Sequence, residues 1–158
     1  MSYYDPGVWV HPNDSLIKSV EQKIQQDKYL QVVPRSSGFL PPRYSEYFVR
    51  IKSTQELLRL AEAQDQTGKI TITLLEGNAR ILRQGHFNIK NIHRNPDTGA
   101  KIYPPHHMHF PTEKYSNLRR RPAYAYPVKC SSARNDILNK YCDDCNITPD
   151  GFSLRFSF

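Results

Sequence analysis

The sequence contains few cysteines and no long apolar segment. Three cysteines among 158 residues argue against a disulfide framework. No apolar run approaches the roughly 18 residues that a membrane-spanning helix needs. The first residues, MSYYDPGVWVHPND, lack the basic start and apolar core of a secretory signal. We therefore expect a protein of the reducing cytoplasm that does not associate with a membrane.

Acidic residues are also in short supply. The chain has 15 Asp and Glu against 22 Lys and Arg, which gives a formal net charge of +7 and a pI near 9.4. Such an excess favours an anionic partner, such as nucleic acid, a phosphorylated small molecule or an acidic protein surface. The alternative is that the charge serves solubility alone.

Apolar residues make up only 38% of the chain, below the typical value of about 45–50%. Ten tyrosines, seven phenylalanines and one tryptophan supply much of the apolar surface, so we expect a core rich in aromatic residues. Twelve prolines against seven glycines indicate extended connections and sharp turns rather than flexible linkers. The length suits one domain with a single core.

Helical periodicity and capping residues predict three helices, over 15–30, 53–69 and 131–147. The first has apolar residues at an i, i+4, i+8 spacing, and its start can be capped by Asn13, Asp14 or Ser15. In the second, Ser53 and Glu56 have the spacing of a capping box, and Gly68 would end the helix. The apolar stripe of this second helix would consist of Leu57, Leu58, Leu60 and Ala61.

Alternating apolar and aromatic residues predict strands over 46–52, 69–76, 101–103, 123–129 and 151–158. The stretch 79–93 reads as one bent strand or two, with Gly85 marking a bulge or bend. Helices and short strands in mixed order predict an α+β fold with a mostly antiparallel sheet and two to three helices. Residues 1–45 would form an arm, with a proline-rich connector at 32–44, packed on a core domain over 46–158.

The C-x-x-C pair, Cys142 and Cys145, has the spacing of a redox motif or of half a zinc site. A zinc ribbon needs a second pair, and only Cys130 remains. The pair also falls at the end of a predicted helix, whereas a redox motif normally opens one. We therefore expect both thiols to lie in the core.

Four of the six histidines lie in IHRNPDTGAKIYPPHHMHFPTE, residues 92–113. In an extended chain, His107 and His109 share one face, and His106 and Met108 share the other. The turn RNPDTG would fold His93 back towards the first pair. A metal site is incomplete here because a third or fourth ligand is missing, so we predict no metal and no cofactor.

Acid–base chemistry fits this stretch better, because one imidazole can accept a proton while another donates one near neutral pH. We predict His93, His107 and His109 as catalytic residues and expect His106 to be dispensable. Nearby cations and an aromatic ring could bind a phosphate or a base. These predicted substrate-binding residues are Arg94, Lys101, Tyr115, Arg119, Arg120 and Arg121.

The stretch FNIKNIHRNPDTGAKIYPPHHMHF, with AYAYP and a helix ending in CNI, resembles an uncharacterised family of small proteins from Firmicutes and their phages. The family pattern is H-x-N-P-D-G followed by isoleucine and P-H-x-H, and it covers about residues 70–147. The same stretch of this chain is also loosely similar to small histidine-rich toxins of toxin–antitoxin pairs. The resemblance marks seven positions: His93, Asn95, Pro96, Asp97, Gly99, His107 and His109. This chain departs from the pattern through Thr98 and the triple arginine.

The resemblance implies a site and a bacterial or phage origin, but no particular reaction. Together with the charge, it leads to two hypotheses. The first is a toxin-like, metal-independent ribonuclease with RNA as its substrate and an antitoxin as a possible partner. The second is a non-catalytic, phage-encoded inhibitor that binds an acidic host protein or nucleic acid.

Overall fold

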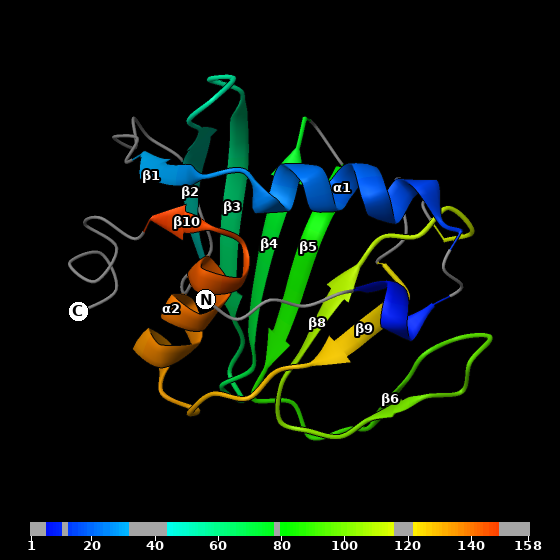
Figure 1. The fold of residues 1–158 in the computed structure, drawn as a ribbon. Helices are drawn as coiled ribbons and strands as arrows, with labels where there is room; N and C mark the ends of the chain where they lie inside the picture. The colour runs from blue at the N-terminus through cyan, green and yellow to red at the C-terminus, as the bar shows by residue number, and fades with distance from the viewer. Residues whose placement is uncertain (1–5, 11–12, 32–43, 78–79, 116–121, 149–158) are drawn as a thin grey trace.

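A large β-sheet with two α-helices on one face forms the body of the protein (Figure 1). The computed structural model describes residues 6–10, 13–31, 44–77, 80–115 and 122–148. The sheet has eight strands in the order β10-β1-β2-β3-β4-β5-β8-β9, and a separate two-stranded ribbon joins β6 to β7. Among the described strands of this sheet, only the β1–β10 pairing is parallel. The predicted α+β class with a mostly antiparallel sheet is confirmed.

The described residues form two α-helices, one 3-10 helix and ten strands. Their bounds are η1 (Pro6–Trp9), α1 (Ser15–Gln25), β1 (Lys28–Gln31), β2 (Tyr44–Ile51), β3 (Leu57–Gln64), β4 (Ile70–Glu76), β5 (Arg80–Phe87), β6 (His93–Arg94), β7 (Lys101–Ile102), β8 (His107–Phe110), β9 (Tyr124–Pro127), α2 (Arg134–Asp144) and β10 (Ile147–Thr148). Strands expected over 46–52, 69–76 and 123–129 are confirmed as β2, β4 and β9. No helix in the described ranges is long and apolar enough to cross a membrane.

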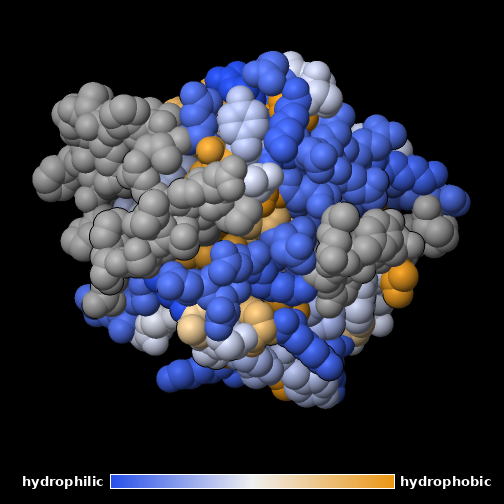
Figure 2. Space-filling model, turned by 60° about the vertical axis from the view of Figure 1, so that its left-hand side comes forward, coloured by the Kyte–Doolittle hydropathy of each residue, from blue (hydrophilic) through white to orange (hydrophobic). Residues whose placement is uncertain are grey.

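The core lies between the helices and the sheet face that they cover. Helix α1 buries Ile17, Val20 and Ile24 in this core. The Asp14 carboxylate caps the start of the helix by accepting a hydrogen bond from the Ile17 amide at 3.0 Å. Seen from another side, the surface is mostly hydrophilic with scattered apolar spots (Figure 2). The buried apolar side chains between the helices and the sheet stabilise the fold through their removal from water.

The N-terminal segment joins this body rather than standing apart from it. Trp9 and Val10 pack against the core, in agreement with the expected packing of the N-terminal arm on the core domain. Strand β1 lies inside the sheet, between β2 and β10. The predicted first helix is shorter than expected, because it ends at Gln25 and Lys28–Gln31 pairs with β2 and β10 instead.

The helix predicted over 53–69 is wrong: its central residues form strand β3. Leu58 and Leu60 alternate with more exposed neighbours and are almost completely buried. The strand pairs along its length with β2 and β4, and these tertiary contacts override a local helix preference. Glu56, the expected capping residue, forms an ion pair with Lys23 at 3.0 Å.

The third predicted helix is confirmed as α2, and the C-x-x-C pair lies where it was expected. Cys142 and Cys145 are 1% and 0% exposed, and burial raises the pKa of the Cys145 thiol to about 11. Both thiols are therefore protonated in the core and unsuited to nucleophilic chemistry. The predicted closing strand at 151–158, most of the connector at 32–44 and Arg119–Arg121 lie outside the described residues.

Gly85 does not mark a bulge, contrary to the sequence prediction. It lies in regular register with Ile72 and Met108, and the irregularity falls between Leu74 and Leu75. A Cβ atom at this position would meet the Phe87 ring at 2.4 Å and the Met108 sulfur at 2.9 Å. Gly85 therefore permits close packing of the sheet rather than a bend.

We expect Gly85→Ala to lower the free energy of unfolding by about 1–3 kcal/mol, the usual cost of overpacking a core. The added methyl group would displace Phe87 and Met108 on the helix-covered face of the sheet. Chemical denaturation measures the change. Ala61→Gly, on a more exposed part of the sheet, controls for the general effect of glycine in a strand. A Gly85→Ala protein as stable as the parent would contradict this packing.

Candidate metal centre

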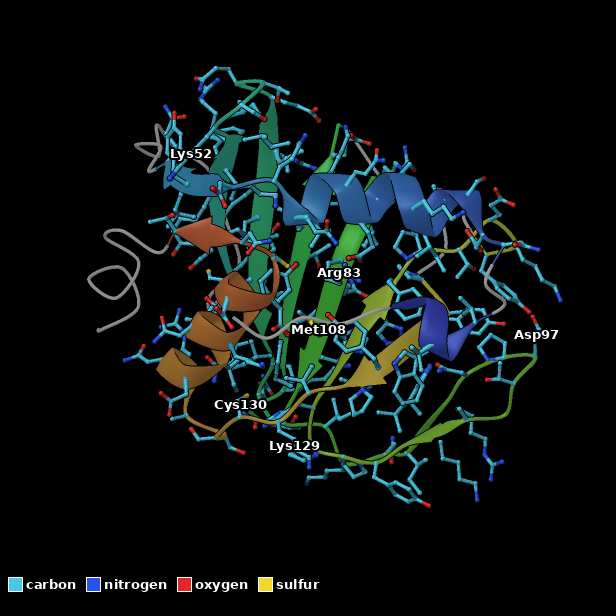
Figure 3. The ribbon with its side chains drawn as sticks, viewed as in Figure 1. Lys52, Arg83, Asp97, Met108, Lys129 and Cys130 are labelled. Atoms are coloured by element: carbon cyan, nitrogen blue, oxygen red, sulfur yellow. The ribbon has the colours of Figure 1, made fainter. Side chains whose placement is uncertain are left out.

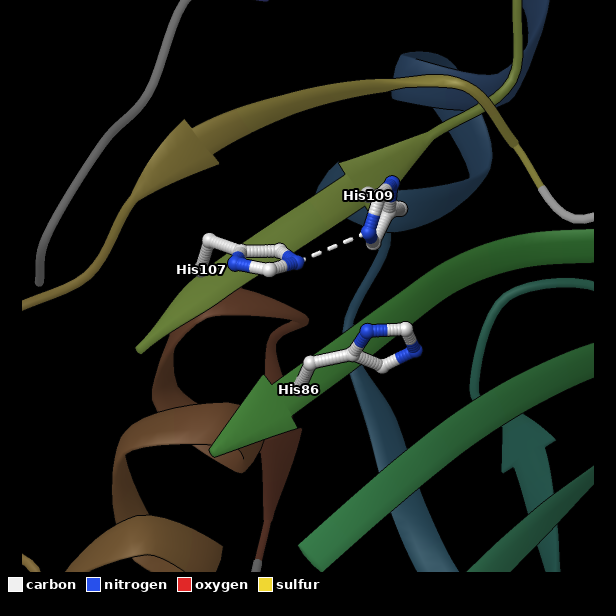
Figure 4. A group of neighbouring side chains, drawn as sticks. All are labelled: His86, His107 and His109. Atoms are coloured by element: carbon white, nitrogen blue, oxygen red, sulfur yellow. Dashed lines mark hydrogen bonds between the residues drawn. The ribbon is translucent and has the colours of Figure 1, made fainter. Parts of the chain in front are cut away.

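Three histidines meet on the sheet face that points away from the helices (Figure 4). Strand β5 pairs with β8 so that His86 lies opposite His107 and Gln84 lies opposite His109. Because side chains alternate along a strand, these residues share one face. Met108 between them is fully buried in the core on the other face. The register therefore assembles a cluster that neither strand could form alone.

The three rings are in close contact. The Nε2 atoms of His107 and His109 lie 2.8 Å apart, and one ring nitrogen from each of the three residues fits within a group 4.8 Å across. His86, His107 and His109 are only 7%, 3% and 5% exposed. The contact between two nitrogens requires that one carries a hydrogen and the other a lone pair.

The cluster is a poor environment for positive charge. Burial, reinforced by His86 and His93 nearby, lowers the pKa of His107 to about 3. Burial and the neighbouring histidines likewise hold the pKa of His109 well below its usual range. Both rings are consequently neutral at physiological pH, and a neutral imidazole is the form that binds a metal ion.

Hydrogen bonds behind His86 fix which of its nitrogens carries the proton. Gln84 Nε2 donates to Thr73 Oγ1 at 3.1 Å, which leaves Gln84 Oε1 facing His86 Nε2 at 3.1 Å. A carbonyl oxygen only accepts, so His86 Nε2 carries the hydrogen and Nδ1 carries the lone pair in the neutral ring. Such outer partners orient the histidine ligands of metal sites.

His93 reaches the cluster from the β6–β7 hairpin. Its ring centroid lies 4.8 Å from that of His109 and 5.1 Å from that of His107. Its Nε2 lies 3.0 Å from both Asn95 Oδ1 and Ala123 O, so this nitrogen is the donor. The predicted turn therefore does bring His93 to the other two histidines, as a neighbour beside the three-nitrogen group.

Asn95 fastens the hairpin to the edge of the sheet. Its side chain donates to Ala125 O at 2.9 Å and accepts from Ala125 N at 2.8 Å, as a neighbouring strand would. Asn95 is 2% exposed, and β9 is the last strand of the sheet. The amide thus pairs with the backbone of β9 at Ala125 and holds His93 over the cluster.

The other predicted site residues are not in the cluster. His106 points to the opposite face, where its Nδ1 accepts from the Asn88 amide at 3.2 Å and its ring contacts Phe87. Arg94 and Lys101 are exposed and lie opposite each other on the hairpin. Tyr115 lies beside Tyr124, and its hydroxyl donates to Asp97 at 3.4 Å.

His86 is the residue that the sequence reasoning missed, and it changes the chemistry that the site can perform. The sequence offered two histidines on one strand, which is too few for a metal ion. With His86 the site offers three buried imidazoles, which is the ligand number of a catalytic zinc centre. A local signal existed, because Gln84 and His86 alternate on one face of a predicted strand, but their partner strand could not be identified from it.

Comparison with known proteins gives no independent guide to this site. No family model, curated protein or solved structure matches the chain.

Proposed function

We propose that His86, His107 and His109 bind a divalent transition metal ion of the zinc class. The observation that carries the proposal is the group of three buried ring nitrogens within 4.8 Å of one another. Imidazole ligands suit zinc, copper, nickel and iron, whereas magnesium and calcium prefer oxygen ligands. Three imidazole ligands therefore favour zinc, copper, nickel or iron over magnesium and calcium.

The spacing of the nitrogens is close to what a zinc ion requires. With Zn–N bonds of about 2.0–2.1 Å in a tetrahedral site, two ligand atoms lie roughly 3.4 Å apart. The closest pair here is 2.8 Å apart, and the group extends to 4.8 Å. The zinc spacing thus lies between the shortest nitrogen–nitrogen distance of the group and its full width.

Three protein ligands leave one coordination position open, which distinguishes catalytic zinc sites from closed structural ones. A bound ion would lower the pKa of a water molecule at that position to about 7 and so supply a hydroxide for hydrolysis. The chain's own contribution is to hold three imidazole ligands in a site shielded from solvent. We accordingly propose a metal-dependent hydrolytic centre.

Metal binding can be measured directly with Zn²⁺ and a competing chromophoric chelator. We expect one tight site per chain, and His86→Ala or His107→Ala should weaken it by more than the roughly 10- to 100-fold seen for outer-shell substitutions. His106→Ala is the matched control, because that ring lies on the other face of the sheet. Equal Zn²⁺ affinity in the His86, His106 and His107 variants would refute the centre.

A metal-independent ribonuclease, the first hypothesis from the sequence, is the second candidate. The hydrogen bond between His107 and His109 favours it, since one ring donates its Nε2 hydrogen to the other across 2.8 Å. The burial of both rings and the low pKa of His107, about 3, work against an imidazolium acid near neutral pH. RNA cleavage that is lost in His109→Ala but persists in excess EDTA would favour this candidate over the metal centre.

A further inference from the structure

The outward face of the β6–β7 hairpin combines positive charge with exposed apolar side chains. In this two-stranded ribbon His93 lies opposite Ile102, and Arg94 lies opposite Lys101. Ile102 is 1% exposed and faces the body of the protein, whereas Arg94 and Lys101 are exposed. Alternation along the chain places the flanking Ile92 and Tyr103 on the same outward face as the two cations.

Among the residues that the structure describes, the two cations lie side by side with no acidic partner. Neither Arg94 nor Lys101 takes part in any ion pair among the described residues. The one acidic residue of the turn, Asp97, already accepts from Lys114 at 3.1 Å and from Tyr124 at 2.9 Å. Like charges directly opposite each other destabilise a strand pair. A bound anion would remove this repulsion.

The apolar part of the same face is unusual for this protein. Ile92 and Tyr103 are 50% and 63% exposed, and they are two of only four large apolar side chains exposed among the described residues. A tyrosine ring that lies open to solvent can stack on a nucleobase of any sequence. Cations that neutralise phosphates beside a stacking platform are the elements of a single-strand binding surface.

We infer that this face of the hairpin, formed by Ile92, Arg94, Lys101 and Tyr103, binds single-stranded nucleic acid. Arg94 and Lys101 contact successive phosphates, and Tyr103 stacks on a base. The net charge of +7 favours the same partner. The inference does not depend on the metal centre, because these four side chains lie on the side of the ribbon away from His93. A strand bound there would nevertheless lie against the hairpin that carries His93 to the histidine cluster.

Binding can be tested by fluorescence anisotropy with a labelled 12-nucleotide single-stranded RNA, its DNA equivalent and a DNA duplex. Arg94→Gln/Lys101→Gln is compared with Lys18→Gln/Lys52→Gln, which removes the same charge from exposed sites elsewhere. Figure 3 shows Lys52 at the far end of the sheet from the hairpin tip at Asp97. Thermal melting of each variant controls for folding.

The hairpin double variant should bind single strands at least about 10-fold more weakly, and its salt slope should fall by about 0.7 per lost phosphate contact. Tyr103→Ala should weaken binding by about 5- to 150-fold, whereas Tyr103→Phe should retain it. The melting temperature of the hairpin double variant should not fall, because removing the two like charges relieves the repulsion between them. RNA bound more tightly than DNA would assign a role to the 2′-hydroxyl.

Three outcomes would overturn the inference. The first is an equal loss of affinity in the two charge variants, which would indicate a diffuse electrostatic attraction. The second is binding that is indifferent to Tyr103→Ala. The third is a preference for the duplex, or no binding to any of the three probes.

Discussion

Addition of Zn²⁺ to the chelator-treated protein is expected to raise its melting temperature by about 10 °C. At a free Zn²⁺ concentration 1,000 times the dissociation constant, binding to the native state alone adds about 4.1 kcal/mol of stability. For a chain of this length each kcal/mol shifts the midpoint by roughly 2–4 °C. Differential scanning fluorimetry across a Zn²⁺ series measures the shift directly.

The shift should disappear in His86→Ala and persist in His106→Ala. His86 contributes one of the three clustered nitrogens, whereas His106 packs against Phe87 on the opposite face. Comparing the two variants separates loss of a ligand from loss of a buried ring. A full Zn²⁺ response in His86→Ala would show that the ion binds elsewhere, and the proposed centre would then be wrong.

Acidification below pH 6.5 is expected to destabilise the metal-free protein steeply. The native pKa of His107 is lowered to about 3 and that of His109 also falls well below 6.5, the ordinary value. Between about pH 3 and 6.5 the unfolded chain therefore binds more protons than the native one, and stability falls as the pH falls. Each histidine that stays neutral in the native state contributes about 1.4 kcal/mol per pH unit.

The contribution of the cluster can be separated from that of the carboxylates by comparing variants. Urea unfolding at intervals from pH 4 to 7, with chelator present, should give a shallower pH dependence for His107→Gln than for the parent protein. The carboxylates titrate equally in both proteins, so the difference isolates His107. Parallel curves for the two proteins would contradict the buried neutral state of this ring.

Much of the sheet could be predicted because buried and more exposed side chains alternate along its strands. This alternation is visible in each segment of sequence without knowledge of the neighbouring strand. In β4, Ile70, Ile72 and Leu74 face the core, and the same alternation is visible in the sequence. Strand β3 was mistaken for a helix because its leucines and alanine also fit a helical stripe. Pairing with the neighbouring strands β2 and β4 selects the strand over the helix. The local sequence of β3 does not encode this pairing.

The sequence by itself determined that His107 and His109 share one face of a strand, that His106 faces the other way, and that a turn can return His93 towards them. These are consequences of local backbone geometry. Only the tertiary structure decided that His86 joins them, because the β5–β8 register couples residues 21 positions apart. The same register buries the rings and so makes them neutral, since desolvation acts only once the surrounding chain is in place. A candidate acid–base site thus became a candidate metal centre.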